Sequence, residues 1–206
     1  MPANGCEVMK KTVVLCTGGI GSGKSYVIKV FNCLGIPSYD SDANAKQLYD
    51  TDQLLLQQVA EIAGEDVVVN GVLQRQLFAS RIFSDPDKLN RVEDAVHPAV
   101  VRHFNKWKEE QESDIVIIES AILLESPELV SLPDYVIAVS APLKIRIDRV
   151  MKRDGLTMDQ VLERLDNQWS DEERIRYADF VIKTNDRDAI IPEAIKILFQ
   201  IRNGKR

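Results

Sequence analysis

The chain has 206 residues, enough to bury the core of one domain with a small inserted subdomain and too few for two unrelated domains. Its composition, 45% hydrophobic and 28% charged, is that of a soluble globular protein, and no apolar run reaches the roughly 18 residues of a membrane span. The net charge of −6 disfavours general binding to nucleic acid, which needs clustered lysine and arginine.

The N-terminal residues hold no apolar segment followed by a small-residue cleavage site, so no secretion signal is predicted and we expect a cytoplasmic protein. The three cysteines form no C-x-x-C pair, which disfavours a zinc site or a disulfide framework. Cys16 and Cys33 are expected to be buried thiols that pack as small hydrophobic groups.

Short, nearly continuous apolar runs alternate with helical patterns along the chain. The runs predict strands at residues 12–16, 36–39, 115–118, 135–139 and 180–183. Strands of this kind, separated by helices, are typical of a parallel sheet that is covered on both faces. We therefore predict an α/β fold with a five-stranded parallel sheet.

The helical patterns lie between these runs. Helices are expected after Ser25, over residues 43–62, after a tight turn at Asn70-Gly71, from Pro86, over 98–111, over 143–153 and over 157–177, the last with a break near Trp169. The stretch from about 54 to 100 lacks strands, which favours a helical subdomain mounted on the sheet.

Residues 18–25, GGIGSGKS, match the complete phosphate-loop pattern G-x-x-x-x-G-K-[ST]. Glycine is needed where the loop wraps a phosphate so closely that side chains would collide, and where φ is positive. Lys24 is expected to reach the β- and γ-phosphates and the Ser25 hydroxyl to hold magnesium. The predicted nucleotide contacts are Gly19, Ile20, Gly21, Ser22, Gly23, Lys24, Ser25 and Tyr26.

Two carboxylates, Asp40 and Asp42, follow the second predicted strand, at the edge of the sheet where ligands collect. Either could accept the proton of an attacking hydroxyl or order magnesium-bound water. The other possibility is that one of them only caps the helix that begins near Ala43. The alternatives are balanced for Asp40, and function is favoured for Asp42.

Arg146, Arg149 and Arg153 share one face of a predicted helix. Such a face could close over a polyphosphate, with Asp154-Gly155 as a hinge, or it could be a solvated charged face. The closing role is favoured for Arg149 and Arg153. Glu119, at the end of the third strand, is either a carboxylate near the metal or a solvent-facing residue.

Together with these residues, several motifs resemble the dephospho-coenzyme A kinase family of P-loop kinases. They are TGGIGSGKS at 17–25, YDSDANAK at 39–46, NGVLQRQLFASRIFSDP at 70–86, VHP at 96–98, MKRDG at 151–155 and ADFVIKTN at 178–185. The resemblance covers nearly the whole chain. It implies transfer of the γ-phosphoryl group of ATP, with magnesium, to the ribose 3′-hydroxyl of dephospho-CoA, the last step of coenzyme A biosynthesis.

The resemblance also implies roles for single residues. The family's D-A-D motif corresponds to residues 40–42, with Asp42 as base or metal organiser, and its R-D motif to Arg153-Asp154. Lys46 stands where family members usually have arginine, and the family's P-L-L-x-E corresponds to residues 121–125, without the proline. The implied acceptor contacts are Asp40, Lys46, Leu73, Gln74, Arg75, His97 and Glu125.

By the same resemblance, the chain is expected to be a single P-loop kinase domain with three parts. A core covers about 10–42, 95–145 and 178–206, a helical acceptor-binding subdomain about 43–94, and a lid about 146–177. We expect a monomer or small homo-oligomer that binds ATP and dephospho-CoA but neither nucleic acid nor membrane. The alternatives are a nucleoside monophosphate kinase or other small-molecule kinase of this fold, and a binding module switched by ATP.

Overall fold

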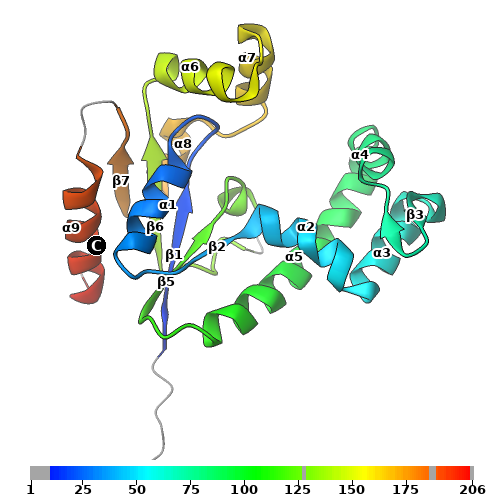
Figure 1. Ribbon diagram of the computed structural model, residues 1–206, viewed down its shortest axis with the longest axis horizontal. Coiled ribbons are helices and arrows are strands. Elements are labelled where there is room, and N and C mark those ends of the chain that lie inside the picture. The colour runs from blue at the N-terminus through cyan, green and yellow to red at the C-terminus, as the bar shows by residue number, and fades with distance from the viewer. Residues whose placement is uncertain (1–9, 127–128, 186–188, 205–206) are drawn as a thin grey trace, which may run out of the picture. The chain divides into compact units, whose positions relative to one another are not determined.

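The computed structural model describes residues 10–126, 129–185 and 189–204. The chain divides into two compact units, the first made of Met1–Tyr39 and Gln111–Arg206 and the second of Asp40–Glu110. Figure 1 labels most of the helices and strands of both units. Among the described residues, no helix has both the length and the apolar character that crossing a membrane would require.

The first unit is built on a five-stranded sheet with the order β2-β5-β1-β6-β7. The strands are β1 (Thr12–Thr17), β2 (Ser38–Asp40), β5 (Ile115–Glu119), β6 (Tyr135–Ser140) and β7 (Phe180–Lys183). Strand β1 pairs in parallel with β5 and β6, and β6 pairs in parallel with β7. The predicted parallel sheet is confirmed, and the middle residues of its inner strands are apolar because both faces of these strands are buried.

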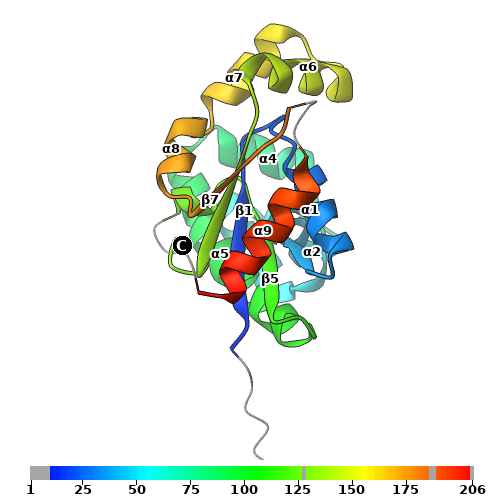
Figure 2. The ribbon, with the colours of Figure 1, turned by 90° about the vertical axis from the view of Figure 1, so that its left-hand side faces the viewer.

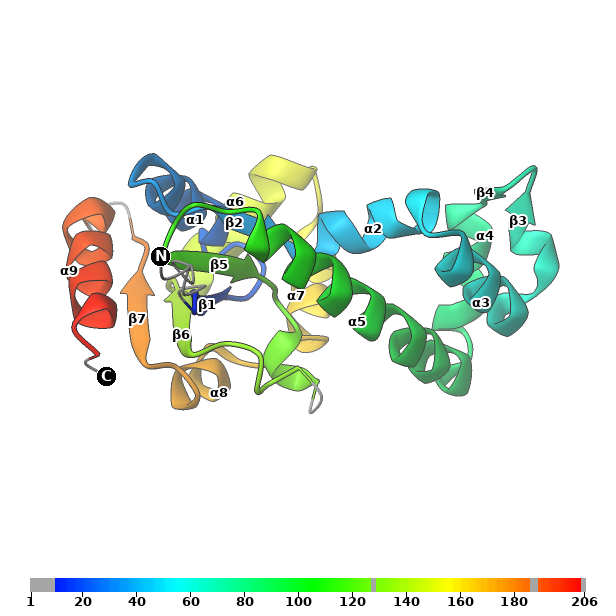
Figure 3. The same cartoon turned by 90° about the horizontal axis from the view of Figure 1, so that it is seen from below.

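Helices cover both faces of this sheet. They are α1 (Lys24–Cys33), α8 (Asp171–Arg176) and α9 (Ile190–Arg202). Helices α6 (Leu143–Asp154) and α7 (Met158–Asp166) pack against each other beyond the carboxyl ends of the strands (Figures 1 and 2), and a short 3₁₀ turn, η2, spans Leu123–Glu125. Helices α1 and α9 lie side by side on one face (Figure 2). Helix α8 packs against β6 on the other face (Figure 3). The predicted break near Trp169 is confirmed, since Ser170 caps α8 there.

The second unit consists of helices and one small hairpin. Its elements are α2 (Ser41–Thr51), α3 (Gln53–Ala63), η1 (Glu65–Val67), β3 (Val68–Val69), β4 (Val72–Leu73), α4 (Arg75–Phe83) and α5 (Pro86–Glu109). The predicted turn at Asn70-Gly71 joins β3 to β4, and both of its residues have positive φ. The helix expected over residues 43–62 is in fact two helices, because Asp52 ends α2 and caps α3.

The prediction of a new helix at Pro98 was wrong. Pro98 lies inside α5, which runs unbroken from Pro86 to Glu109. A proline inside a helix removes one backbone hydrogen bond. The helix continues nevertheless, because its buried side chains, including Val96 and Val100 on either side of Pro98, keep helical spacing along its length. Packing of this apolar face outweighs the local cost.

Candidate active site

The loop between β1 and α1 has all of its central carbonyl groups occupied. Every carbonyl from Gly19 to Gly23 accepts a hydrogen bond. The donors, in the order of these carbonyls, are the N–H of Ser22, Nε of Arg146, Nη1 of Arg149, Oγ1 of Thr184 and the N–H groups of Tyr26 and Val27. Two helical arginines and the residue after β7 therefore hold the outer side of the loop.

The amide groups of the same loop are open. Those of Gly21, Gly23, Lys24 and Ser25 have no acceptor among the residues that the structure describes. In a planar trans peptide the N–H points opposite to the carbonyl. Fixing the Ile20 and Ser22 carbonyls on the outer side thus turns the N–H groups of Gly21 and Gly23 to the opposite side. The N–H groups of Lys24 and Ser25 are first-turn donors of α1, which have no partner within a helix. Converging N–H groups at a helix N-terminus form a binding site for an anion such as a phosphate.

Neighbouring protein groups crowd two of the loop's glycine positions. A Cβ atom on Gly19 would collide with the Arg146 guanidinium, and one on Gly23 would lie 2.8 Å from Oγ1 of Thr184. Gly23 also has a φ of 91°, which a side chain disfavours. Close approach of protein groups therefore disfavours side chains at these two positions.

Lys24, the first residue of α1, forms an ion pair with Glu119 at the carboxyl end of β5. Nζ of Lys24 lies 2.5 Å from Oε1 of Glu119, and the two side chains are only 16% and 12% exposed. Of the two alternatives for Glu119, the solvent-facing one is excluded. The position had a signal in the sequence, because a carboxylate that ends an apolar strand lies at the ligand-binding edge of a parallel sheet.

The helical arginines occupy different positions. Arg149 bonds Thr184 as well as the Gly21 carbonyl, with Nη1 3.0 Å from Oγ1 and Nη2 3.1 Å from the carbonyl oxygen of Thr184. Arg153 extends into solvent and pairs with Asp154 at 2.7 Å, and this hydrogen bond lowers the pKa of the Asp154 carboxyl. Arg149 thus lies at the loop, whereas Arg153 pairs with the residue that follows it.

Two loop contacts were missed by the sequence reasoning. Arg146 bonds the Ile20 carbonyl at 3.0 Å and pairs with Asp171 at 2.8 Å, and Gln168 accepts a 2.9 Å hydrogen bond from the Ile20 N–H. Arg146 had a signal, because it shares a helical face with Arg149. For Gln168 no pattern in a single sequence distinguishes it from other polar residues between helices.

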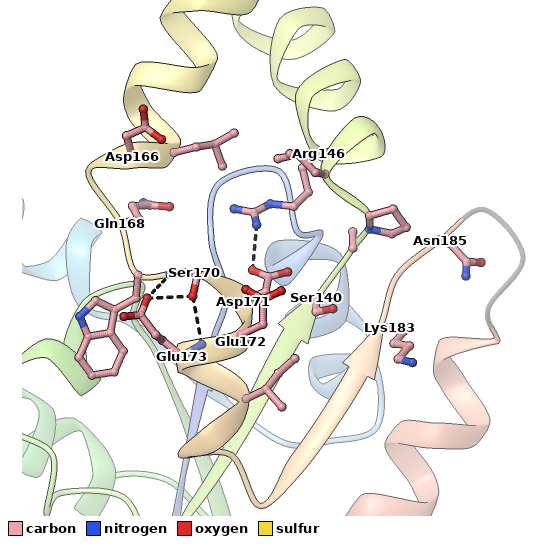
Figure 4. A pocket seen from close by; sticks show the side chains of 16 residues that line it. Ser140, Arg146, Asp166, Gln168, Ser170, Asp171, Glu172, Glu173, Lys183 and Asn185 are labelled. Carbon is pink, nitrogen blue, oxygen red and sulfur yellow. Dashed lines mark hydrogen bonds and ion pairs between the residues drawn. The ribbon is translucent and has the colours of Figure 1, made fainter.

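A cavity of about 740 Å³ lies beside these two residues, between the end of β6, α6 and the start of α8. Figure 4 shows Arg146 pointing across it to Asp171. The lining carries more acidic than basic side chains: Asp166, Asp171, Glu172 and Glu173, against Arg146 and Lys183. A triphosphate would meet repulsion there, so the open amides of the loop, and not this cavity, are the candidate phosphate site.

In the second unit, Asp40 and Asp42 differ in their local roles. Oδ1 of Asp40 accepts the N–H of Ala43 at 2.9 Å and so caps α2. Asp42, in the first turn of α2, is exposed. The capping role therefore belongs to Asp40, which leaves the Asp42 carboxylate available for a ligand.

The remaining predicted acceptor contacts are unequal in exposure. Lys46, Gln74 and Arg75 are exposed, and Arg75 bonds both the Lys46 carbonyl and Asp50. His97 is half-buried, and Leu73 is a core residue with 4% exposure. The side chain of Glu125 lies outside the described part of the structure.

The protein groups beside the loop fit a magnesium ion that takes most of its oxygen ligands from bound phosphate and water. Among the described residues there is no cluster of three or more His, Cys, Asp or Glu side chains that could hold a metal. The Ser25 residue beside the open amides is exposed. Mg²⁺ commonly binds few protein groups and completes its shell with phosphate oxygens and water, which fits a single hydroxyl ligand.

A phosphate loop between the first strand and first helix of this parallel sheet places the chain in the class of P-loop kinases. It belongs to the dephospho-CoA kinase family, because the family model so described matches residues 12–189. The dephospho-CoA kinase of Porphyromonas gingivalis is 40% identical over 190 residues, which are 92% of this chain and 94% of that protein.

Solved structures agree with this assignment. The Thermus thermophilus protein TT1252 is 31% identical with a TM-score of 0.81, over 93% of this chain and 97% of that one. The dephospho-CoA kinase of Campylobacter jejuni is 25% identical with a TM-score of 0.66, over 94% of this chain and 98% of that one.

Proposed function

We propose that the protein transfers the γ-phosphoryl group of ATP to the ribose 3′-hydroxyl of dephospho-CoA. The observation that carries the proposal is the set of open amides between Gly21 and Ser25, next to the ammonium group of Lys24, in a chain of this family. An anion with several phosphates can bond these amides and replace Glu119 as the partner of Lys24.

Binding of the nucleotide uses the loop. The amides hold the β-phosphate region, and Lys24 neutralises the charge that develops on the transferring group. Ser25 would hold Mg²⁺, which when bound withdraws charge from the phosphate oxygens. Arg149 keeps the Gly21 and Thr184 backbone in place and, with Arg153, belongs to the proposed lid at residues 146–177.

The acceptor side rests on the second unit. Asp42 orients the 3′-hydroxyl or removes its proton, while Asp40 fixes the start of α2 that presents Asp42. Lys46, Gln74, Arg75, His97 and Glu125 are proposed to contact dephospho-CoA, with Leu73 supporting them from the core. We further propose that the enzyme is cytoplasmic and a monomer or small homo-oligomer.

A panel of acceptors tests the proposal. ADP release from ATP is measured with dephospho-CoA and, separately, with nucleoside monophosphates. We expect release with dephospho-CoA and the appearance of one phosphate on its ribose by mass spectrometry. Release with nucleoside monophosphates alone would favour a nucleotide kinase, and nucleotide binding without release for any acceptor would favour an ATP-switched binding module.

Substitution of Asp42 tests the acceptor chemistry. Asp42→Asn should lower kcat by about 10²–10⁴-fold with nearly unchanged affinity for ATP, because general-base assistance is lost while the phosphate loop is intact. Asp52→Asn is the matched control, since it removes one carboxylate from the same unit but retains an N-cap for α3. A near-normal kcat for Asp42→Asn would remove Asp42 from the mechanism.

A further inference from the structure

The peptide groups on both sides of Ile20 are bonded by the segment that contains α6, α7 and α8. The N–H of Ile20 donates a hydrogen bond to Oε1 of Gln168 at 2.9 Å, and the carbonyl of Ile20 accepts one from Nε of Arg146 at 3.0 Å. The Ile20 side chain packs against Ile147, Val150 and their neighbours in the small apolar cluster of that segment. Ile20 is thus bonded or packed at its N–H, carbonyl and side chain by one segment.

This arrangement is itself anchored. Arg146 is 8% exposed and its Nη1 lies 2.8 Å from Oδ1 of Asp171, a residue 19% exposed at the start of α8. The guanidinium lies directly against Gly19, since a Cβ atom added there would overlap it. A planar fork held by a carboxylate on one side and a carbonyl on the other is a rigid support.

The support acts on the phosphate site through one peptide. The carbonyl of Ile20 and the N–H of Gly21 belong to the same planar group, so holding the carbonyl sets the direction of the N–H. The Gly21 amide is one of the open donors of the loop. Arg146 therefore fixes the direction of a phosphate-binding amide without needing to contact the phosphate.

We infer that Arg146 and Gln168 are positioning residues, which hold the Ile20 peptides so that the Gly21 amide is aimed at the nucleotide. The inference rests on the triphosphate-binding part of the proposed function and adds residues that the phosphate-loop pattern does not contain. It also couples the loop to the segment around α6 to α8, because a shift of Gln168 or Arg146 must displace Ile20.

Binding of a non-hydrolysable ATP analogue tests the inference without requiring turnover. Arg146→Met keeps the apolar stem but removes the donors, and it should weaken binding of the analogue about tenfold, whereas Arg146→Lys should recover part of the loss. Gln168→Leu should weaken binding about threefold to fivefold. Because both side chains act on Ile20, the double variant should lose less than the product of the single effects.

Trp169, next to Gln168, provides a second readout. In a Trp107→Phe background it is the remaining tryptophan of the chain, and its ring lies 5.4 Å from that of Tyr177. We expect the analogue to change its emission in the parent protein and to change it less in Gln168→Leu. The control is Arg164→Met, which removes an exposed arginine of α7 that pairs with Asp154.

The outcomes separate this inference from the proposed function. Analogue affinities within twofold of the parent for both Arg146→Met and Gln168→Leu, with unchanged emission responses, would overturn it. If melting curves show that Arg146→Met does not fold, Gln168→Leu alone decides. A parent protein that binds the analogue but phosphorylates no dephospho-CoA would refute the proposed function and leave this test intact.

Discussion

At the scale of single residues, local pattern identified groups in the phosphate loop but not the groups that hold it. Lys24 could be found because it lies inside a contiguous motif. Gln168 lies far from the loop in sequence, and its hydrogen bond to Ile20 depends on how α7 and α8 fold back. Contacts of this range are set by tertiary packing, which spacing along a single chain does not encode.

The two described cysteines also differ in a way that composition did not reveal. Both were expected to be buried, but Cys16 is fully buried and Cys33 is exposed at the end of α1. Burial raises the pKa of the Cys16 thiol to about 12, with the nearby Lys24 ammonium opposing and the Glu119 carboxylate adding to the shift.

This shift predicts a loss of stability at alkaline pH. The unfolded thiol ionises near pH 8.5, so the contribution of Cys16 is complete below that pH and is lost as the pH rises toward 12, by up to about 1.4 kcal/mol per pH unit. The free energy of unfolding, measured in urea between pH 7 and 10, should fall less steeply with pH in Cys16→Ala than in the parent protein. Identical slopes for both proteins would contradict the assignment.

At the scale of elements, periodicity predicted the strands well and the helix boundaries less well. The parallel strands are short apolar runs that only a doubly covered sheet can bury, so their number and order of appearance could be read directly. The break at Asp52 and the continuity through Pro98 could not, since each depends on whether a cap or a packed face dominates at one residue.

The glycine loop is the element whose shape should tolerate least change. In Gly23→Ala the new Cβ would face Oγ1 of Thr184 at 2.8 Å at a φ of 91°, so we expect nucleotide affinity to fall more than tenfold. Gly35→Ala is the control, because it has a similar φ of 81° but no atom within 4 Å of the added group.

Both glycine variants should lose a few degrees of melting temperature, because each forces a side chain into the left-handed region. Nucleotide binding, measured by isothermal titration, should separate them. Equal affinities for Gly23→Ala and Gly35→Ala would show that crowding at Thr184 does not matter.

At the scale of the whole molecule, burial is uneven between the sheet and the segment beside the loop. Strands β1 and β5 are buried along nearly their full length, whereas Val161 is the buried residue of α7 and Arg174 that of α8. Elements with few buried side chains open locally at low free-energy cost.

The fold class was predictable at this scale, because it follows from the alternation of strands and helices.

Amide hydrogen exchange should reveal this difference in local stability between the strands and the helices beside the loop. In the free protein, amides of β1 and β5 should exchange slowest and those of α7 and α8 among the fastest, with the difference read by mass spectrometry of proteolytic peptides. Addition of the non-hydrolysable ATP analogue should slow exchange in the loop peptide. Protection of α7 equal to that of β1 would contradict the picture of a weakly held segment.

The hydrogen bonds that the carbonyl groups of the phosphate loop accept bear on how the site forms during translation. Arg146, Arg149 and Thr184 supply donors that hold a loop encoded before residue 26. During synthesis on the ribosome, the motif therefore emerges long before the side chains that shape it. A nascent chain shorter than 184 residues lacks the hydrogen bond from Thr184, so we expect it to bind nucleotide more weakly than the whole polypeptide.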